Sequence, residues 1–169
     1  MNNLDYGIIG NCRSAALISK NGSIDWCCLP EFDSSSVFAK LLDDDIGGSF
    51  GIDVDDSYEI QQAYDSETAI LITSFTSGEN SFELHDFMPR YYRSEGSHFA
   101  PPELVRYVKL VSGKPSFKVL YDPKLEYAQG KTKSFIKKDF IASLTHEVKF
   151  DTVFLYTSFD KESVVQGNE

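Results

Sequence analysis

The residues of this sequence best suited to do chemistry are its carboxylates. Those that neighbour apolar or aromatic residues along the chain are Asp25, Asp33, Asp43, Asp44, Asp45, Asp86, Asp122 and Glu126. Hydrolysis of a glycosidic bond uses two carboxyl groups held about 5–10 Å apart, with the surroundings keeping one of them protonated. Spacing along the chain does not establish such a distance, and surface solubility is the alternative role for most of these side chains.

Two short motifs match the letters of known active-site loops but lie in the wrong context. Residues 47–51 read G-x-S-x-G, which in hydrolases places a serine on a turn between a strand and a helix. Residues 52–54 instead read as a strand, so a glycine-rich strand entry is the better interpretation. Gly130-Lys131-Thr132 ends like a phosphate-binding loop, but Leu125 stands where that loop needs a glycine. The sequence therefore predicts no catalytic residue.

Metal ligands are scarce in this sequence. The histidines and cysteines are His85, His98, His146, Cys12, Cys27 and Cys28. Residues 53–59 alternate like the first ligands of a calcium loop, but Tyr58 stands where the sharp bend needs glycine. Adjacent cysteines seldom bridge each other, and an odd number leaves at least one thiol free. We expect no metal, no cofactor and free thiols in a reducing cytoplasm.

The elements that must position these residues read as strands, because most apolar residues recur with period two between turn residues. The predicted strands are 6–9, 15–19, 23–29, 49–54, 58–63, 69–76, 82–87, 104–111, 116–121, 135–137, 140–144, 147–150 and 153–157. Turn residues at 21–22, 77–80 and 112–114 predict three hairpins, and 94–102 is the longest predicted loop. One short helix is predicted, capped by Ser35 or Ser36 and ending before Asp43. The pattern indicates an all-β antiparallel sandwich or barrel.

Composition excludes several classes of protein. The chain has 169 residues with 26 acidic and 16 basic side chains, a net charge of −10, and 41% hydrophobic and 14% aromatic residues. These values describe a folded single domain, 1–169, and exclude intrinsic disorder. An acidic surface repels nucleic acid, and the sequence has neither a signal peptide pattern nor a long apolar run. We expect a cytoplasmic protein with no nucleic-acid or membrane partner.

One stretch is distinctive enough to indicate a family. The segments 5–11 (DYGIIGN), 15–18 (AALI), 22–26 (GSIDW) and 29–38 (LPEFDSSSVF) resemble the N-terminal domain of bacterial and archaeal glycoside hydrolase family 15 proteins of the glucoamylase-like or trehalase-like type. The likeness continues through 86–89 (DFMP), 105–106 (VR), 122–123 (DP) and 125–128. It spans nearly the whole chain, and its first block is the most specific.

The resemblance implies a large β-sandwich of the supersandwich type that precedes a catalytic (α/α)6 toroid, which hydrolyses α-glucosidic bonds with inversion. In that family the catalytic acid and base are glutamates of the toroid. A toroid needs about a dozen helices and several hundred residues, so it is not contained in this chain. The chain is predicted to be inactive alone, and its partner is predicted to be the catalytic domain of the same polypeptide. A complete short protein that binds sugar or another protein through the same sandwich is the alternative.

Two groups of residues are candidate sites. The loop after the predicted strand that contains Trp26 includes Glu31, Phe32 and Asp33, and it is predicted to face the catalytic domain near its substrate pocket. A structural turn at Asp33 is the alternative. Aromatic residues in or beside the longest loop could form a platform for an α-glucan or trehalose: Tyr91, Tyr92 and Phe99. Packing of that loop against itself is the alternative interpretation for these rings.

Overall fold

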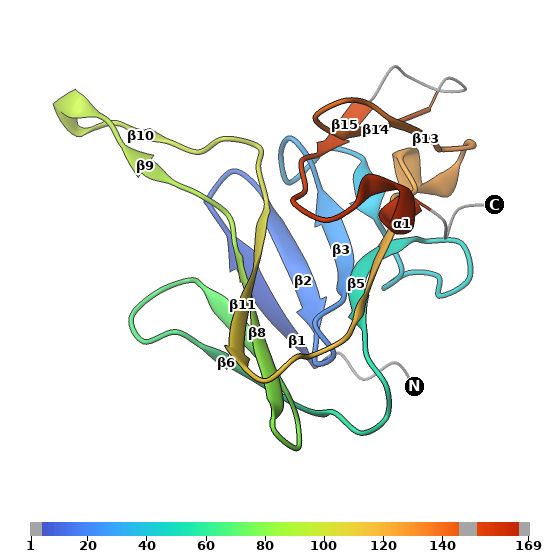
Figure 1. The fold of residues 1–169 in the computed structure, drawn as a ribbon. Helices are drawn as coiled ribbons and strands as arrows, with labels where there is room; N and C mark the ends of the chain where they lie inside the picture. The colour runs from blue at the N-terminus through green and yellow to red at the C-terminus, as the bar shows by residue number, and fades with distance from the viewer. Residues whose placement is uncertain (1–4, 146–151, 166–169) are drawn as a thin grey trace.

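The computed structural model describes residues 5–145 and 152–165, which form antiparallel β-sheets (Figure 1). The first strands are β1 (Tyr6–Gly10), β2 (Ala15–Ser19), β3 (Ile24–Cys28), β4 (Ser36–Phe38), β5 (Ser49–Asp53), β6 (Glu59–Tyr64), β7 (Leu71–Ser77) and β8 (Asn80–Phe87). They are followed by β9 (Tyr91–Tyr92), β10 (His98–Phe99), β11 (Val105–Ser112), β12 (Lys118–Asp122), β13 (Lys133–Ile136), β14 (Ile141–Leu144) and β15 (Thr152–Leu155). Short helical segments lie at Ser94–Gly96, Glu126–Ala128 and α1 (Lys161–Val165). The predicted all-β class is confirmed.

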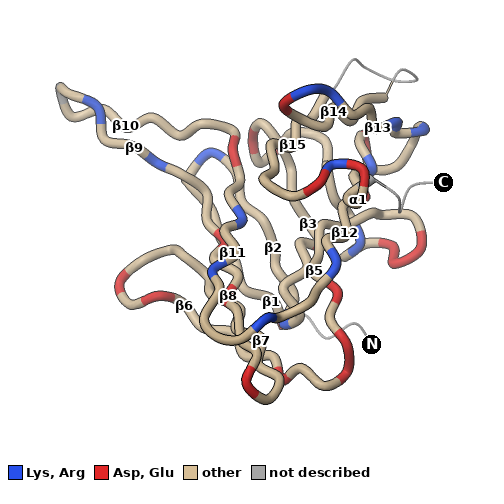
Figure 2. The backbone as a smooth tube through the Cα atoms, in the orientation of Figure 1, with Lys and Arg blue, Asp and Glu red and all other residues tan. Residues whose placement is uncertain are grey.

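Two sheets form the body of the molecule. Sheet A has the order β1-β2-β3-β5-β12, with β4 also paired to β3, and sheet B has the order β11-β8-β7-β6. A ribbon of β9 and β10 projects from the body, and β13, β14 and β15 form a small separate sheet (Figure 1). Acidic residues lie largely on connecting turns, as at 43–45 and 65–67, and colour these parts of the backbone red in Figure 2.

The inner faces of sheets A and B pack on each other. Burial alternates along the strands, as in β2, where Ala16 and Ile18 are buried between less buried neighbours. The two sheets approach closely at Gly7, where a Cβ atom would lie 2.4 Å from the Leu71 side chain of sheet B. Any side chain at this position would require the buried Leu71 side chain to move, so the glycine allows the close contact between the two sheets.

Aromatic rings fill the end of the core beneath sheet B. Phe75 and Phe82 stack with ring centroids 4.6 Å apart, and Phe117 lies 4.8 Å from Phe82. Phe75 and Phe82 are fully buried, and Phe82 lies on the inner face of β8 opposite Leu110 of β11. Stacked pairs of this kind add roughly 0.5–1.5 kcal/mol beyond the burial of their area.

The helix predicted after Ser36 is wrong, because this segment forms β4. Ser36 and Phe38 pair with Cys28 and Cys27 of β3, and Val37 is also buried. Pairing with a neighbouring strand supplies more burial than one isolated turn of helix, so the tertiary contact overrides the local pattern. The short helix of the structure lies instead at Lys161–Val165.

The hairpins at 21–22 and 77–80 are confirmed, whereas the hairpin at 112–114 is wrong. β11 belongs to sheet B and β12 to sheet A, so residues 113–117 cross between the sheets. The crossing is held by the turn between β7 and β8, since the amide of Lys114 donates to Asn80 Oδ1 at 2.9 Å and the Ser112 hydroxyl donates to the Glu79 carbonyl at 2.7 Å.

The sequence also predicts structure for the segments 94–102 and 147–150. The long loop predicted at 94–102 contains β10 and the short helical turn Ser94–Gly96. The strand predicted at 147–150 lies outside the described residues. No helix in the described part of the chain has the length and apolar character needed to cross a membrane.

Candidate functional site

Several loops meet at one end of sheet A, around the turn that joins β1 to β2. Asn11 in this turn is buried, and its amide nitrogen donates to the carbonyl oxygens of Pro89 at 3.2 Å and Pro101 at 2.9 Å. Its side-chain oxygen accepts the amides of Arg13 and Ser14, both at 3.1 Å. Asn11 thus connects the β1–β2 turn to both segments at the base of the β9–β10 ribbon, the one before β9 and the one after β10.

Arg13 extends this junction to the predicted interdomain loop. Its guanidinium lies 3.3 Å from Glu31 Oε1 and donates to the Ala100 carbonyl at 3.4 Å. The Arg13 carbonyl accepts the amide of Phe32 at 3.1 Å. The loop after β3 and the base of the ribbon are therefore neighbours, and we call these residues, 11–14, 29–35, 88–90 and 100–102, the loop end.

The structure places the candidates Glu31, Phe32 and Asp33 on a tight turn of the loop end. The Glu31 amide donates to the Ser34 hydroxyl at 3.0 Å, and the Ser34 amide donates back to the Glu31 carbonyl at 3.1 Å. Phe32 is 62% exposed and Asp33 is also exposed. An exposed phenyl ring on an ordered turn is available for contact with another surface.

The candidates Tyr91, Tyr92 and Phe99 come together on the projecting ribbon, but not on one face. Phe99 is paired across the ribbon with Tyr91, whereas Tyr92 is paired with His98. Because neighbouring residues of a strand point to opposite faces, Tyr91 and Phe99 lie on one face and Tyr92 on the other. The Arg93 guanidinium lies 4.1 Å from the centre of the Phe99 ring and covers it. Tyr92 is the most exposed of the three candidate rings, at 70%.

A left-handed turn beside the loop end was missed by the sequence reasoning. Glu126, Tyr127 and Ala128 have φ values of 54°, 55° and 57°. Such angles are unfavourable for residues other than glycine, so no local signal identifies this turn. Glu126 accepts the Ser35 hydroxyl at 2.8 Å, and Tyr127 lies against Trp26 with ring centroids 6.3 Å apart.

The two buried carboxylates, Asp25 and Asp86, are held in hydrogen bonds that support the fold. Asp25 accepts the Ser23 hydroxyl at 2.6 Å and the Tyr6 hydroxyl at 3.1 Å. Burial, followed by the nearby Asp25 charge, raises the pKa of Tyr6 to about 12. Asp86 forms an ion pair with Arg106, with Nε 2.8 Å from Oδ1. Within residues 5–145 and 152–165, no three His, Cys, Asp or Glu side chains gather as a metal site.

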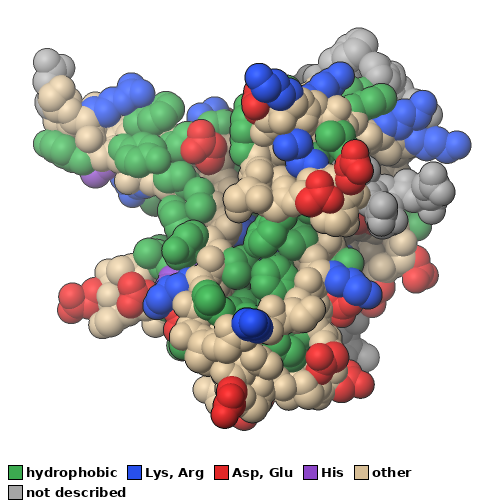
Figure 3. All heavy atoms as spheres, viewed as in Figure 1, with side chains coloured by type: hydrophobic (Ala, Val, Ile, Leu, Met, Phe, Trp, Pro, Cys, Tyr) green, Lys and Arg blue, Asp and Glu red, His purple; other side chains and the backbone are tan. Residues whose placement is uncertain are grey.

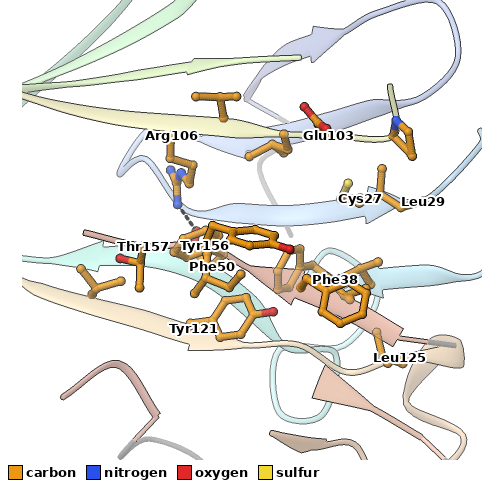
Figure 4. Close-up of a pocket in the computed structure, with 18 of the residues that line it drawn as sticks. Cys27, Leu29, Phe38, Phe50, Glu103, Arg106, Tyr121, Leu125, Tyr156 and Thr157 are labelled. Carbon is orange, nitrogen blue, oxygen red and sulfur yellow. Dashed lines mark hydrogen bonds between the residues drawn. The ribbon is translucent and has the colours of Figure 1, made fainter. Parts of the chain in front are cut away.

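An apolar groove opens between the inner faces of the two sheets. It has a volume of about 790 Å³, and Figure 3 shows hydrophobic side chains in the hollow between the two sides of the molecule. Its apolar lining includes Leu29, Phe38, Phe50, Val108, Val119 and Tyr121. The rings of Phe38, Phe50 and Tyr121 contact one another, with centroids 5.2–6.2 Å apart (Figure 4). The groove is therefore a part of the sandwich core that lies open.

The sequence of the chain matches a known family of domains. A family model described as trehalase-like, N-terminal, matches residues 5–147. The chain belongs to this family of N-terminal domains, found in archaeal and bacterial trehalases of glycoside hydrolase family 15. The resemblance predicted from the segments around Trp26 is confirmed.

Three relatives illustrate the match. The chain is 37% identical to a trehalase of Thermoplasma volcanium over 168 residues, which cover 97% of this chain and 24% of that protein. It is 33% identical to trehalase 2 of Sulfolobus acidocaldarius over 146 residues, 86% of this chain and 23% of that protein. A trehalase of Mycolicibacterium smegmatis is 29% identical over 135 residues, 73% of this chain and 20% of that protein. The match thus spans between a fifth and a quarter of the length of these relatives. No solved structure matches it with a significant score.

Proposed function

We propose that this chain acts as the noncatalytic N-terminal β-domain of an inverting α-glucoside hydrolase of the glucoamylase or trehalase type, and that it supports the folding and orientation of a C-terminal (α/α)6 catalytic domain. The observation that carries the proposal is the match of nearly the whole chain to the N-terminal quarter of proteins named trehalase. The domain would work in the cytoplasm, which is consistent with the free thiols of Cys12, Cys27 and Cys28.

The side chains support a positioning role rather than hydrolysis within this domain. Hydrolysis by inversion needs two carboxyl groups across a space that holds sugar and water. Asp86 is already ion-paired with Arg106, and Asp25 already accepts hydrogen bonds from Ser23 and Tyr6. The loop end instead offers exposed groups on a rigid base, with Phe32 and Asp33 on its surface. We propose that this turn faces the catalytic domain near the entrance of its substrate pocket.

A chimaera tests this proposal. Residues 1–169 replace the matching N-terminal quarter of the Thermoplasma volcanium trehalase, and release of glucose from trehalose is measured for the chimaera, for the remaining three quarters alone and for residues 1–169 alone. We expect activity in the chimaera, at least about tenfold less in the remainder alone because it lacks its supporting domain, and none in residues 1–169. Full activity of the remainder alone, or hydrolysis by residues 1–169, would contradict the proposal.

The second candidate is carbohydrate binding by the ribbon, favoured by the exposure of Tyr91 and Tyr92, 54% and 70%. Aromatic rings that stack on sugars need an exposed face, and Tyr92 is the most exposed of the three candidate rings, with a ring contact to His98 at a centroid distance of 5.4 Å. Calorimetric titration of residues 1–169 with trehalose, maltose and longer α-glucans separates the two functions. Heat that disappears in Tyr92→Ala supports binding by the ribbon, and absence of heat at millimolar sugar excludes it.

A further inference from the structure

One long edge of sheet B is open. β11 pairs with β8 on one side, and within the described residues no strand pairs with its other side. β11 has eight residues and, together with β8, is the longest strand of the structure. An open edge of this length presents a row of unpaired backbone donors and acceptors, which is a template for another strand.

The inner face of β11 has two apolar side chains beyond Arg106, and it is only partly covered. Val108 and Leu110 are paired with Leu84 and Phe82, both buried, and cross-strand partners share a face. Leu110 is nevertheless 63% exposed. A single exposed leucine is ordinary, but Leu110 lies on the same face of β11 as Val108, which lines the apolar groove, so a strand added along this face would cover both side chains.

The apolar groove lies beside this edge. Residues of β11 and of the segment before it line one side, and Val119 and Tyr121 of β12, the edge strand of sheet A, line another; β15 and the residues after it, 152–159, also border the groove. Both edges therefore border one hollow that continues into the core (Figures 3 and 4). An extended segment added to β11 would place alternate side chains in this hollow.

The chemistry of the groove favours polypeptide over sugar. Sugar recognition needs convergent polar groups that are free to bond. Arg106, one of the charged side chains that line the groove, already donates to Asp86 and to the carbonyls of Gly22 and Phe50. The lining also includes Ser36 and Glu126, whose Oγ and Oε1 atoms are buried without a hydrogen-bond partner among the described residues. The free edge of β11 offers backbone donors and acceptors, which pair with a polypeptide strand and not with a sugar ring, and most of the remaining lining is aliphatic or aromatic.

We propose that an extended apolar segment of the polypeptide that follows the matched quarter in the trehalase relatives pairs with the free edge of β11 and fills the groove. This inference rests on the proposed function, because the occupant comes from the part of those proteins outside this match. About three quarters of the Thermoplasma volcanium protein lies outside it, which leaves ample chain for an added strand.

Hydrogen exchange tests the proposal on residues 1–169 and on the chimaera. In residues 1–169 we expect the amides of β11 that do not bond to β8 to exchange freely. In the chimaera they should exchange at least about tenfold more slowly, because an added strand bonds them. The matched control is β6 (Glu59–Tyr64), the opposite edge strand of sheet B, whose exchange should not change.

Paired variants give a second readout. Leu110→Lys charges the inner face of β11, whereas Tyr107→Lys charges its outer face at a position that is 57% exposed. Neither change should alter the Tm of residues 1–169, because both side chains are exposed there. Leu110→Lys should lower the Tm of the chimaera by about 2–4 °C or more, since the lysine would be buried, and Tyr107→Lys should not.

The outcomes separate the two proposals. An active chimaera in which β11 remains unprotected and Leu110→Lys behaves like Tyr107→Lys overturns the strand addition and leaves the domain role intact. A chimaera without trehalose hydrolysis overturns both. Protection of β11 in residues 1–169 that depends on protein concentration, with a dimer in sedimentation, identifies a second copy as the occupant and also overturns the proposal. If trehalose alone protects the β11 amides of residues 1–169 from exchange, the occupant is a sugar and the proposal is overturned.

Discussion

The guanidinium of Arg106 forms a bidentate ion pair with the carboxylate of Asp86, with Nε 2.8 Å from Oδ1 and Nη2 3.0 Å from Oδ2. The two residues are cross-strand partners in β11 and β8, and their side chains are 6% and 0% exposed. The same guanidinium donates to the carbonyls of Gly22 and Phe50 in the facing sheet. The pair therefore joins sheet B to sheet A through the core.

Arg106→Met should destabilise the chain strongly. It leaves the Asp86 carboxylate buried without a partner, which typically costs about 3–5 kcal/mol of unfolding free energy. The double variant with Asp86→Leu should recover a part of that loss. Lys109→Met, which removes an exposed pair with Glu83, is the control and should cost less than about 1 kcal/mol. Urea unfolding measures all three, and equal midpoints for the two methionine variants would refute the joining role.

Thiol labelling should divide the cysteines into two classes. Cys12 is exposed, whereas Cys27 and Cys28 are buried. Burial, with a smaller contribution from Cys28, raises the pKa of Cys27 to about 12, and burial also raises the pKa of Cys28. At pH 8 we expect one fast equivalent of reaction with a thiol reagent, absent in Cys12→Ser, and all three only in denaturant. Fast reaction of Cys12→Ser would contradict the buried placement.

The raised thiol pKa values also predict an alkaline limit to stability. The folded state holds the Cys27 thiol neutral up to a pKa of about 12, above its ordinary value of 9.0. The stabilisation is thus fully present below about pH 9 and is lost as the pH rises toward 12. Cys27→Ala should reduce this alkaline loss, measured as the urea midpoint at pH 8 and at higher pH.

The lowered pKa of Glu83 predicts that the free energy of unfolding falls at acid pH, whereas the raised pKa of Cys27 predicts a fall at alkaline pH. Hydrogen bonds from His85, at 2.8 Å, and from Lys109, at 3.0 Å, lower its pKa below the ordinary value. A lowered folded-state pKa gives stability that is present above the unfolded-state pKa, about 4.3, and is lost as the pH falls through the folded-state value. Glu83→Gln should therefore lower the urea midpoint at pH 6 and match the wild type near pH 2. The same difference at both pH values would count against this ionisation.

Asn11→Ala should loosen the ribbon without unfolding the sheets. The variant leaves the carbonyls of Pro89 and Pro101 without the Asn11 donor, at a cost of about 1–3 kcal/mol. Hydrogen exchange at β9 and β10 should accelerate, whereas exchange in β7 should not. Uniform acceleration throughout the chain would show that Asn11 supports the whole fold and not this junction.

Asp33→Ala distinguishes the two roles offered for the turn after β3. If the turn faces the substrate entrance, the chimaera should show a raised KM or a lowered kcat for trehalose, while residues 1–169 keep their Tm. Asp56→Ala, on an exposed turn after β5, is the matched control and should change neither quantity. Unchanged kinetics with a lowered Tm would leave Asp33 only a structural role.

Much of the fold follows from local sequence patterns. The alternation in β2 and β8 and the glycine of the turn at 77–80 identify strands and a hairpin because side chains alternate across a strand and Gly78 adopts a φ of +58°. The segments around Trp26 also identified the family. Each of these signals lies within a few neighbouring residues, so one sequence suffices to find it.

Contacts between distant residues were decided by the tertiary structure alone. Pairing with β3 made a strand of Ser36–Phe38, and the crossing at Gly113 placed β11 and β12 in different sheets. Asn11 meets Pro101 and Arg106 meets Gly22 across separations of 90 and 84 residues. The sequence by itself determined an acidic, all-β domain of a hydrolase family. Which strands pair, which loops share one end and which edge stays open depend on burial summed over the whole core, and no local pattern encodes that sum.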